Sequence, residues 1–380
     1  MEKIKLYIKK DPMLLVAIIA ALISLIITPP TTNLIRNIDW HTLGTLFMML
    51  TVLEGFKQEM LFNPIIKLCS NLKTMTSLSL FLVFGVFFSS MFVTNDVSLI
   101  IFVPLTILIF RELDEEKYIL PVISMENIAA IRGSLLTPFG SPQNLFLYQQ
   151  SGMKAGHFML HMLPLSVSSA ILLIIFVLVM YRKEKGNVIE LSHETLTKKW
   201  SAQDKPKRIT YMILFIMILI SIVSRTKYWP IAVIVVIVMI SIVNRKLFKS
   251  VDYALLVTFF CFFIFSSSIT ANPMINSLGQ RLVTGHEYIS VILLSQIISN
   301  VPASIVLYPF SENFAGLIYG ADTAGLCSLI GSLASVINYR IYVREYPGKG
   351  KAFIYTFTLI SWAFFLIVVI PGYLLSHWPF

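Results

Sequence analysis

Two short polar sequences, each set within an apolar stretch, hold the residues best suited to binding chemistry. They are Thr94-Asn95-Asp96 and Ser299-Asn300-Val301, and in both a proline follows the asparagine by nine residues, at Pro104 and Pro309. Hydroxyl and amide oxygens are hard ligands of the kind that a sodium ion accepts. Backbone leaves a helix at membrane depth only where it lines a cavity, so each interrupted stretch predicts a re-entrant hairpin.

The composition places these motifs in a membrane protein. Of the 380 residues, 56% are hydrophobic and only 13% are charged, an apolar share above that of soluble domains. The formal net charge of +10 does not indicate a nucleic-acid partner, because the lysines and arginines lie almost entirely in short segments between apolar runs. The cysteines Cys69, Cys261 and Cys327 show no metal or disulfide spacing. We expect a polytopic membrane protein without a cofactor.

Apolar runs close to the roughly 20 residues that a crossing helix needs predict nine crossings. They lie near residues 12–28, 40–56, 118–141, 157–181, 209–224, 230–243, 251–270, 318–339 and 353–375. Two further apolar stretches, 77–110 and 287–311, are interrupted by the Asn motifs and are predicted as hairpins that enter and leave on one side. An odd number of crossings places the two termini on opposite sides.

The distribution of positive charge sets the expected orientation. Six segments that this layout puts on one side contain 24 of the 30 Lys and Arg residues. These segments are 1–10, 57–74, 111–117, 182–208, 244–250 and 340–351. By the positive-inside rule, we expect a protein of the plasma or inner membrane, with a cytoplasmic N-terminus and the C-terminus outside.

Two halves of the chain resemble each other in sequence order. We expect a first repeat at 1–181, a cytoplasmic linker at 182–208 and a second repeat at 209–380, with broken helices at 118–141 and 318–339. The matched pairs are Asp39-Trp40 with Asp252-Tyr253, Thr94-Asn95 with Ser299-Asn300, and Thr137-Pro138-Phe139-Gly140-Ser141 with Ser328-Leu329-Ile330-Gly331-Ser332. The first repeat begins on the outer side and the second on the inner side, so the pattern predicts inverted repeats.

The motifs resemble those of the ion transporter superfamily, which includes divalent anion:sodium symporters, citrate transporters, arsenite efflux permeases and one group of sodium/proton antiporters. The resemblance covers nearly the whole chain from Asp39 and rests on Thr94-Asn95-Asp96, Thr137 to Leu145, Ser299 to Ala303 and Ser328 to Ser332. The divalent anion branch carries Ser-Asn-Thr at both hairpin tips, and this chain departs from it at the third position of each. The resemblance implies an all-α elevator-type transporter that forms a homodimer.

We expect solute and coupling ion to bind where the hairpin tips meet the helix breaks. The candidate residues are Thr94, Asn95, Asp96, Thr137, Gly140, Ser141, Asn144, Ser299, Asn300, Ser328, Gly331 and Ser332. Four helix N-termini converging there suit an anion without any lysine or arginine. Freed carbonyls and amide oxygens at Asn95, Gly140, Asn300 and Gly331 suit sodium.

Several of these residues have alternative roles. Asp96 either takes part in coupling or caps the second hairpin arm, and Asn95 and Asn300 either bind an ion or hold helices together. We expect Arg132 to pair with an acid on another helix, and Asp322 to lie near the outer mouth of its span at a helix start.

The predicted function is secondary active transport of a small anion, a carboxylate or an inorganic oxyanion, coupled to sodium or protons. An arsenite or antimonite efflux permease, or a sodium/proton antiporter, is the alternative within the same fold. A membrane-embedded enzyme is not predicted, because no HExxH, GxSxG or suitably spaced carboxylate pair occurs. A channel is disfavoured because nothing resembles a selectivity filter.

Overall fold

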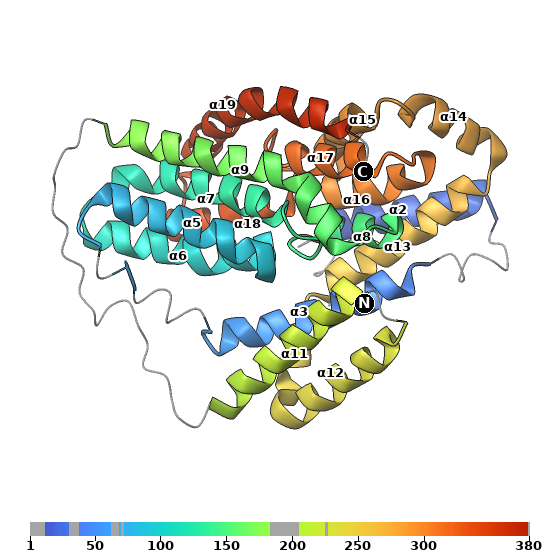
Figure 1. The fold of residues 1–380 in the computed structure, drawn as a ribbon, viewed down its shortest axis with the longest axis horizontal. Coiled ribbons are helices and arrows are strands. Elements are labelled where there is room, and N and C mark those ends of the chain that lie inside the picture. The colour runs from blue at the N-terminus through green and yellow to red at the C-terminus, as the bar shows by residue number, and fades with distance from the viewer. Residues whose placement is uncertain are drawn as a thin grey trace.

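Every regular element of the described residues is a helix (Figure 1). The computed structural model describes residues 12–29, 38–61, 68–69, 72–182, 205–224 and 227–378. The first half contains α2 (Pro12–Ile27), α3 (Trp40–Gln58), α5 (Met75–Val93), α6 (Asn95–Glu112), η2 (Glu116–Tyr118), α7 (Ile119–Ser134), α8 (Pro142–Ser151) and α9 (Ala155–Met180). The second half contains α11 (Lys205–Ser224), α12 (Trp229–Asn244), η4 (Arg245–Lys249), α13 (Tyr253–Thr270), α14 (Pro273–Val283), α15 (Glu287–Ile298), α16 (Asn300–Leu307), η5 (Tyr308–Phe310), α17 (Phe314–Ala324), α18 (Leu333–Glu345) and α19 (Gly350–Ser376).

The helices form two packed groups, and Figure 1 shows α3, α11 and α12 below the helices of the second group. The α3 group comprises α2, α3, α11, α12 and α13: α3 packs on α11, α12 and α13, and α13 packs on α2. The hairpin group comprises α5 to α9 and α15 to α19. The groups meet where α13 packs on α16 and where α3 contacts α6 and α8.

The two halves of the chain interleave within the hairpin group. Helix α18 of the second half packs against α6 and α7 of the first, and α8 packs against α16 and α17. Residues far apart in sequence therefore meet at the breaks between α7 and α8 and between α17 and α18.

The helix starts at Asp39 and Asp252 have the same local geometry. Both N-cap residues have φ −77°, with ψ 81° at Asp39 and 82° at Asp252. The Asp39 carboxylate accepts a hydrogen bond from the Thr42 N–H at 2.9 Å, and the Asp252 carboxylate accepts one from the Leu255 N–H at 3.1 Å. An aspartate cap satisfies a first-turn N–H that has no partner within the helix, which explains why α3 and α13 begin there.

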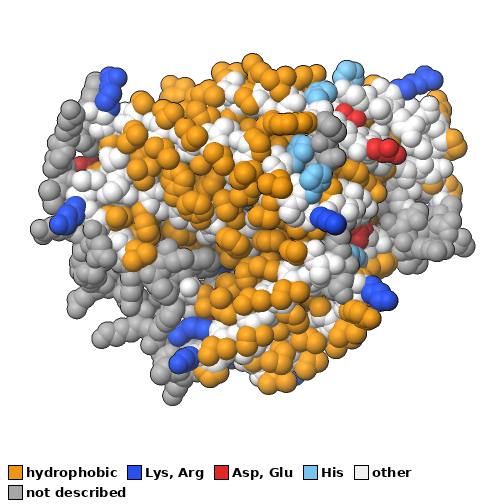
Figure 2. Space-filling view, in the orientation of Figure 1, with side chains coloured by type: hydrophobic (Ala, Val, Ile, Leu, Met, Phe, Trp, Pro, Cys, Tyr) orange, Lys and Arg blue, Asp and Glu red, His pale blue; other side chains and the backbone are white. Residues whose placement is uncertain are grey.

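The all-helical, multi-pass architecture expected from composition is confirmed. Six helices of the described residues are long and apolar enough to cross a membrane. They are α5, α9, α11, α12 with η4, α13 and α19. Figure 2 shows hydrophobic side chains spread across the face that includes α9, with Lys and Arg at its margins. On α12 only Val236 and Ile240 are fully buried, and the side that faces away from α3 and α11 presents an apolar surface outward, as lipid contact requires.

Two predicted spans have the wrong bounds. The span expected at 118–141 ends with the break itself, at the cap of the second arm, and that arm, α8, continues to Ser151. The span expected at 318–339 begins within α17, and α18 continues to Glu345. The sequences of α8 and α18 are polar enough to resemble loops. Both segments are nevertheless helical, because they are packed against other helices of the protein. Most of the expected linker at 182–208 lies outside the described residues, and the amphipathic helix α14 was not predicted.

Candidate functional site

The tips between paired helices have strained backbones. Thr94, between α5 and α6, has φ 74° and ψ 156°, and Ser299, between α15 and α16, has φ 70° and ψ 159°. This region of conformational space is almost restricted to glycine and costs about 1–3 kcal/mol for other residues. The same strain at matched positions in both halves marks the two tips as candidates for a functional site.

Each tip is hydrogen-bonded to the helix break of its own half. The Asn95 N–H donates to the Gly140 carbonyl at 3.2 Å, and the Asn300 N–H donates to the Gly331 carbonyl, also at 3.2 Å. Both glycines approach other backbone closely: a Cβ added at Gly140 would lie 2.4 Å from the Ser134 carbonyl oxygen, and one at Gly331 would meet a carbonyl oxygen at 2.3 Å. No larger residue fits without moving the break.

The hydroxyls of Thr137 and Ser328, which are predicted site residues, connect each break to its hairpin. Thr137 Oγ1 donates to the Met91 carbonyl. Ser328 Oγ donates to Gln296 Oε1 at 2.7 Å. Gln296 was not predicted from the sequence, although it precedes Asn300 by four residues, as Met91 precedes Asn95. Comparing the two halves position by position would have found it.

The asparagine side chains are nearly fully buried and make local contacts. Asn95 Oδ1 accepts a hydrogen bond from the Asp96 N–H at 2.9 Å, and Asn300 Nδ2 donates to the Ala321 carbonyl at 3.2 Å. Asn144 Nδ2 donates to the Ser134 carbonyl at 3.1 Å and so connects the end of α7 to the first turn of α8. These bonds stabilise the tips and breaks in their present shape.

The two serines that precede the second half-helices differ in whether their side chains cap the helix. Ser141 caps α8, because its Oγ accepts a hydrogen bond from the Asn144 N–H at 3.4 Å. Ser332 begins α18 without a side-chain cap. The N-terminus of α18 therefore keeps more of its backbone N–H groups available than that of α8.

A cavity of about 200 Å³ lies between the two helix groups. Its wall includes three of the predicted site residues, Thr94, Asp96 and Ser141, together with Leu333, which follows Ser332. The other predicted residues do not line it. The remaining lining residues are Leu46, Met49, Leu50, Leu53, Glu54, Lys57, Val97, Ile100, Phe139, Pro142, Leu145, Ser250, Asp252, Leu255 and Ile337. The α3 group and the hairpin group thus both contribute to one cavity.

The charged residues of the cavity are mostly acidic. Glu54 Oε2 and Lys57 Nζ form an ion pair at 2.5 Å, while Asp96 and Asp252 have no basic partner in the cavity wall. Asp96 is partly buried, and its Oδ1 atom is enclosed without a hydrogen-bond partner. Asp96 lies in the first turn of α6, where an acid is favoured by the positive end of the helix, so the helix-cap and coupling roles both remain open.

A second polar centre lies within the hairpin group, where α7 and α17 end. Arg132 and Asp322 are fully buried and attract each other electrostatically, although they form no direct ion pair. Arg132 Nη2 donates to Thr323 Oγ1 at 3.5 Å, and Thr323 is the counterpart of Arg132 when Gly140 is matched to Gly331. The expected acidic neighbour on another helix is present. The expected position of Asp322 was wrong, because it lies in the last turn of α17.

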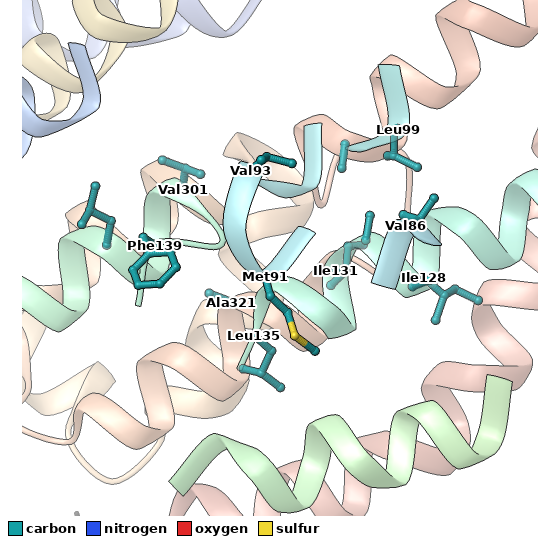
Figure 3. Close-up of a cluster of buried hydrophobic side chains, with 14 of the residues drawn as sticks. Val86, Met91, Val93, Leu99, Ile128, Ile131, Leu135, Phe139, Val301 and Ala321 are labelled. Atoms are coloured by element: carbon teal, nitrogen blue, oxygen red, sulfur yellow. The ribbon is translucent and has the colours of Figure 1, made fainter. Parts of the chain in front are cut away.

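Apolar side chains bring the two hairpin tips together. Figure 3 shows Val301, at the start of α16, in one buried cluster with Val93 and Phe139 from the first half. Apolar side chains from both tips therefore share one core. Among the described residues, no group of three or more His, Cys, Asp and Glu side chains is placed to hold a metal ion.

The fold and this site define the class of protein. Several apolar membrane-length helices surround helix breaks and strained tips, and a charged cavity reaches those breaks, which is the construction of a membrane transporter. Comparison with known proteins gives the family: residues 4–317 match the citrate transporter family, so the chain belongs to that family.

Two curated relatives match along most of their length. The chain is 29% identical over 346 residues to the inner membrane protein YbiR of Escherichia coli, covering 88% of this chain and 89% of that protein. It is 28% identical over 345 residues to the uncharacterized transporter MJ0456 of Methanocaldococcus jannaschii, covering 90% and 91%. Both similarities extend across the two halves of the site.

Proposed function

We propose that this protein is a secondary active transporter that moves a small anion, a carboxylate or an inorganic oxyanion, coupled to sodium or protons. The observation that carries the proposal is the pair of tip-to-break contacts, Asn95 to Gly140 and Asn300 to Gly331, each of which holds two helix N-termini of its own half together. The helices α6, α8, α16 and α18 all begin at these contacts. Each N-terminus carries about half a positive charge and unpaired N–H groups, which suit an anion.

The same contacts supply ligands for a coupling cation. Carbonyl oxygens at Gly140 and Gly331 and amide oxygens at Asn95 and Asn300 are hard donors, which sodium prefers. A carbonyl oxygen has two lone pairs, so an N–H bond to the glycine carbonyl leaves one available. The strained tips of Thr94 and Ser299 keep this geometry fixed before ligand binds.

The matched geometry of the two halves supports inverted repeats and an elevator movement. In this proposal the α3 group is a scaffold and the hairpin group moves against it, carrying the site across the membrane. The cavity contains Lys57 and Ser250, from segments expected in the cytoplasm, and Asp252, at the inner end of a predicted span, so the present arrangement is proposed to face inward. We further propose a homodimer in the plasma or inner membrane, with the N-terminus cytoplasmic and the C-terminus outside.

One observation favours an alternative solute. Asp96 and Asp252 give the cavity two acids without a basic partner, which is unfavourable beside an anion unless a cation accompanies it. Arsenite or antimonite efflux, or sodium/proton antiport, requires no bound anion at this position. A cation at Asp96 is common to both proposals.

Thermal unfolding of the purified protein tests the solute class. Sodium, citrate, succinate, sulfate and arsenite are added singly and in pairs, since a ligand at 100 times its Kd adds about 2.7 kcal/mol of stability. Stabilisation by a carboxylate or oxyanion only when sodium or acid is present supports the proposal. Stabilisation by sodium alone, with every anion inactive, supports the antiporter. Uptake into proteoliposomes that stops at a ratio set by the ion gradient then distinguishes a transporter from a channel.

A further inference from the structure

The cavity brings together one carboxylate from each helix group. Asp96 lies in the first turn of α6, in the hairpin group, and Asp252 caps α13, in the α3 group. Both line the same cavity, so like charges on the two carboxylates repel each other across it. Any movement of one group against the other changes the distance between these two charges.

No basic side chain of the cavity wall neutralises this pair. Lys57 is the basic residue of the wall, and its Nζ is held by Glu54 at 2.5 Å; α7, α8 and α18 contribute no charged residue. Asp252 accepts a hydrogen bond from the Leu255 N–H at 3.1 Å, whereas the Asp96 carboxylate accepts none. Asp252 is exposed at the rim of the cavity, whereas Asp96 is partly buried with one oxygen enclosed, so a second negative charge beside Asp96 is unfavourable unless a cation or a proton neutralises one of them.

We propose that Asp252 is a gating residue: a monovalent cation, sodium or a proton, bound at Asp96 is held by both carboxylates when the two groups are docked as they are here. When that cation leaves, the repulsion between Asp96 and Asp252 drives the hairpin group away from the cytoplasmic end of α13. This inference rests on the proposed movement of the hairpin group. It makes the stability of the present, inward-facing arrangement depend on the bound cation.

The first half of the chain lacks an equivalent gate. Asp39 caps α3 with the same backbone geometry as Asp252, but it does not line the cavity. Its carboxylate instead accepts hydrogen bonds from Thr42 Oγ1 at 2.5 Å and from Gln150 Nε2 at 2.8 Å. The second hairpin tip carries Val301 at the position of Asp96, so this tip offers no acid to pair with Asp39.

The matched variants Asp252→Asn and Asp39→Asn test the gate. Asparagine caps a helix about as well as aspartate, so each change removes a charge and leaves the cap in place. Thermal unfolding of the full-length protein is followed during a sodium titration at pH 8, with choline keeping ionic strength constant, and during a titration from pH 8 to 5.5 without sodium. We expect one ion to stabilise the wild type, and Asp252→Asn to need about tenfold more of it, while Asp39→Asn follows the wild type.

Three outcomes overturn the gate: an unchanged titration in Asp252→Asn, equal shifts in both variants, or a wild type that neither ion stabilises. If the titration is unchanged but wild-type uptake still follows the ion gradient, the proposed function stands and only the gate is lost. If uptake fails altogether, the proposed function is lost, and the binding titration still reports separately on the acid pair.

Discussion

Adding one methyl group at Gly140 should disable the site while leaving most of the fold intact. The Cβ of Gly140→Ala would lie 2.4 Å from the Ser134 carbonyl oxygen, well inside contact distance, so the end of α7 must move. Overpacking of this kind costs about 1–3 kcal/mol. The bond from the Asn95 N–H to the Gly140 carbonyl, now 3.2 Å, contributes about 0.5–1.5 kcal/mol, and it is lost if the break shifts. The combined loss is about 2–4 kcal/mol.

Uptake into proteoliposomes and thermal unfolding are measured together for this variant. We expect at least a tenfold fall in uptake, because displacing site groups by about 1 Å is costly even when the protein remains folded. Gly331→Ala should behave alike, since its Cβ would meet the Ala324 carbonyl oxygen at 2.3 Å. Gly156→Ala is the control, because nothing lies within 4 Å of its added Cβ. Uptake by Gly140→Ala equal to that of the control would refute the role of the break.

Further predictions concern the tips, the topology and the buried charges. Asn95→Ala and Asn300→Ala should each abolish transport in protein that still inserts and folds; wild-type flux from either would remove the tips from the site. A cysteine placed within 190–205 should be labelled only from the cytoplasm and one within 376–380 only from outside, and cytoplasmic labelling of the tail would mean that one hairpin crosses the membrane. Arg132→Met should lower the free energy of unfolding by about 3 kcal/mol, because it leaves a buried acid without its counter-charge, and an unchanged melting temperature contradicts this.

Composition and segment lengths were sufficient to predict the architecture. An apolar share of 56% and runs of crossing length predict a helical membrane protein directly, because a spanning backbone must satisfy its own hydrogen bonds. Where the half-helices end was harder to predict. Helix α8 contains Gln143 and Asn144, which read as a loop, and their burial depends on packing against the second half of the chain.

The site could be predicted only where the sequence repeats itself. Thr94, Asp96 and Ser141 were found because the polar tips and breaks recur, and the structure places them in one cavity. Asp252 was recognised only as a mark of the repeat, because its place in the cavity depends on how α13 docks beside the first hairpin. Asp322 was misplaced because the sequence does not show which end of a broken helix faces the centre of the protein.

The coupling role of Asp96 is tested most directly by the steady-state ratio of solute inside and outside vesicles under an imposed membrane potential. Each net positive charge that enters with the solute at about 100 mV contributes roughly 2.3 kcal/mol, enough for about a 50-fold gradient. We predict that Asp96→Asn keeps solute exchange but reaches a ratio about 50-fold lower than the wild type. Equal ratios in the two proteins would contradict a coupled cation at Asp96, and loss of exchange itself would make Asp96 a solute-binding residue instead.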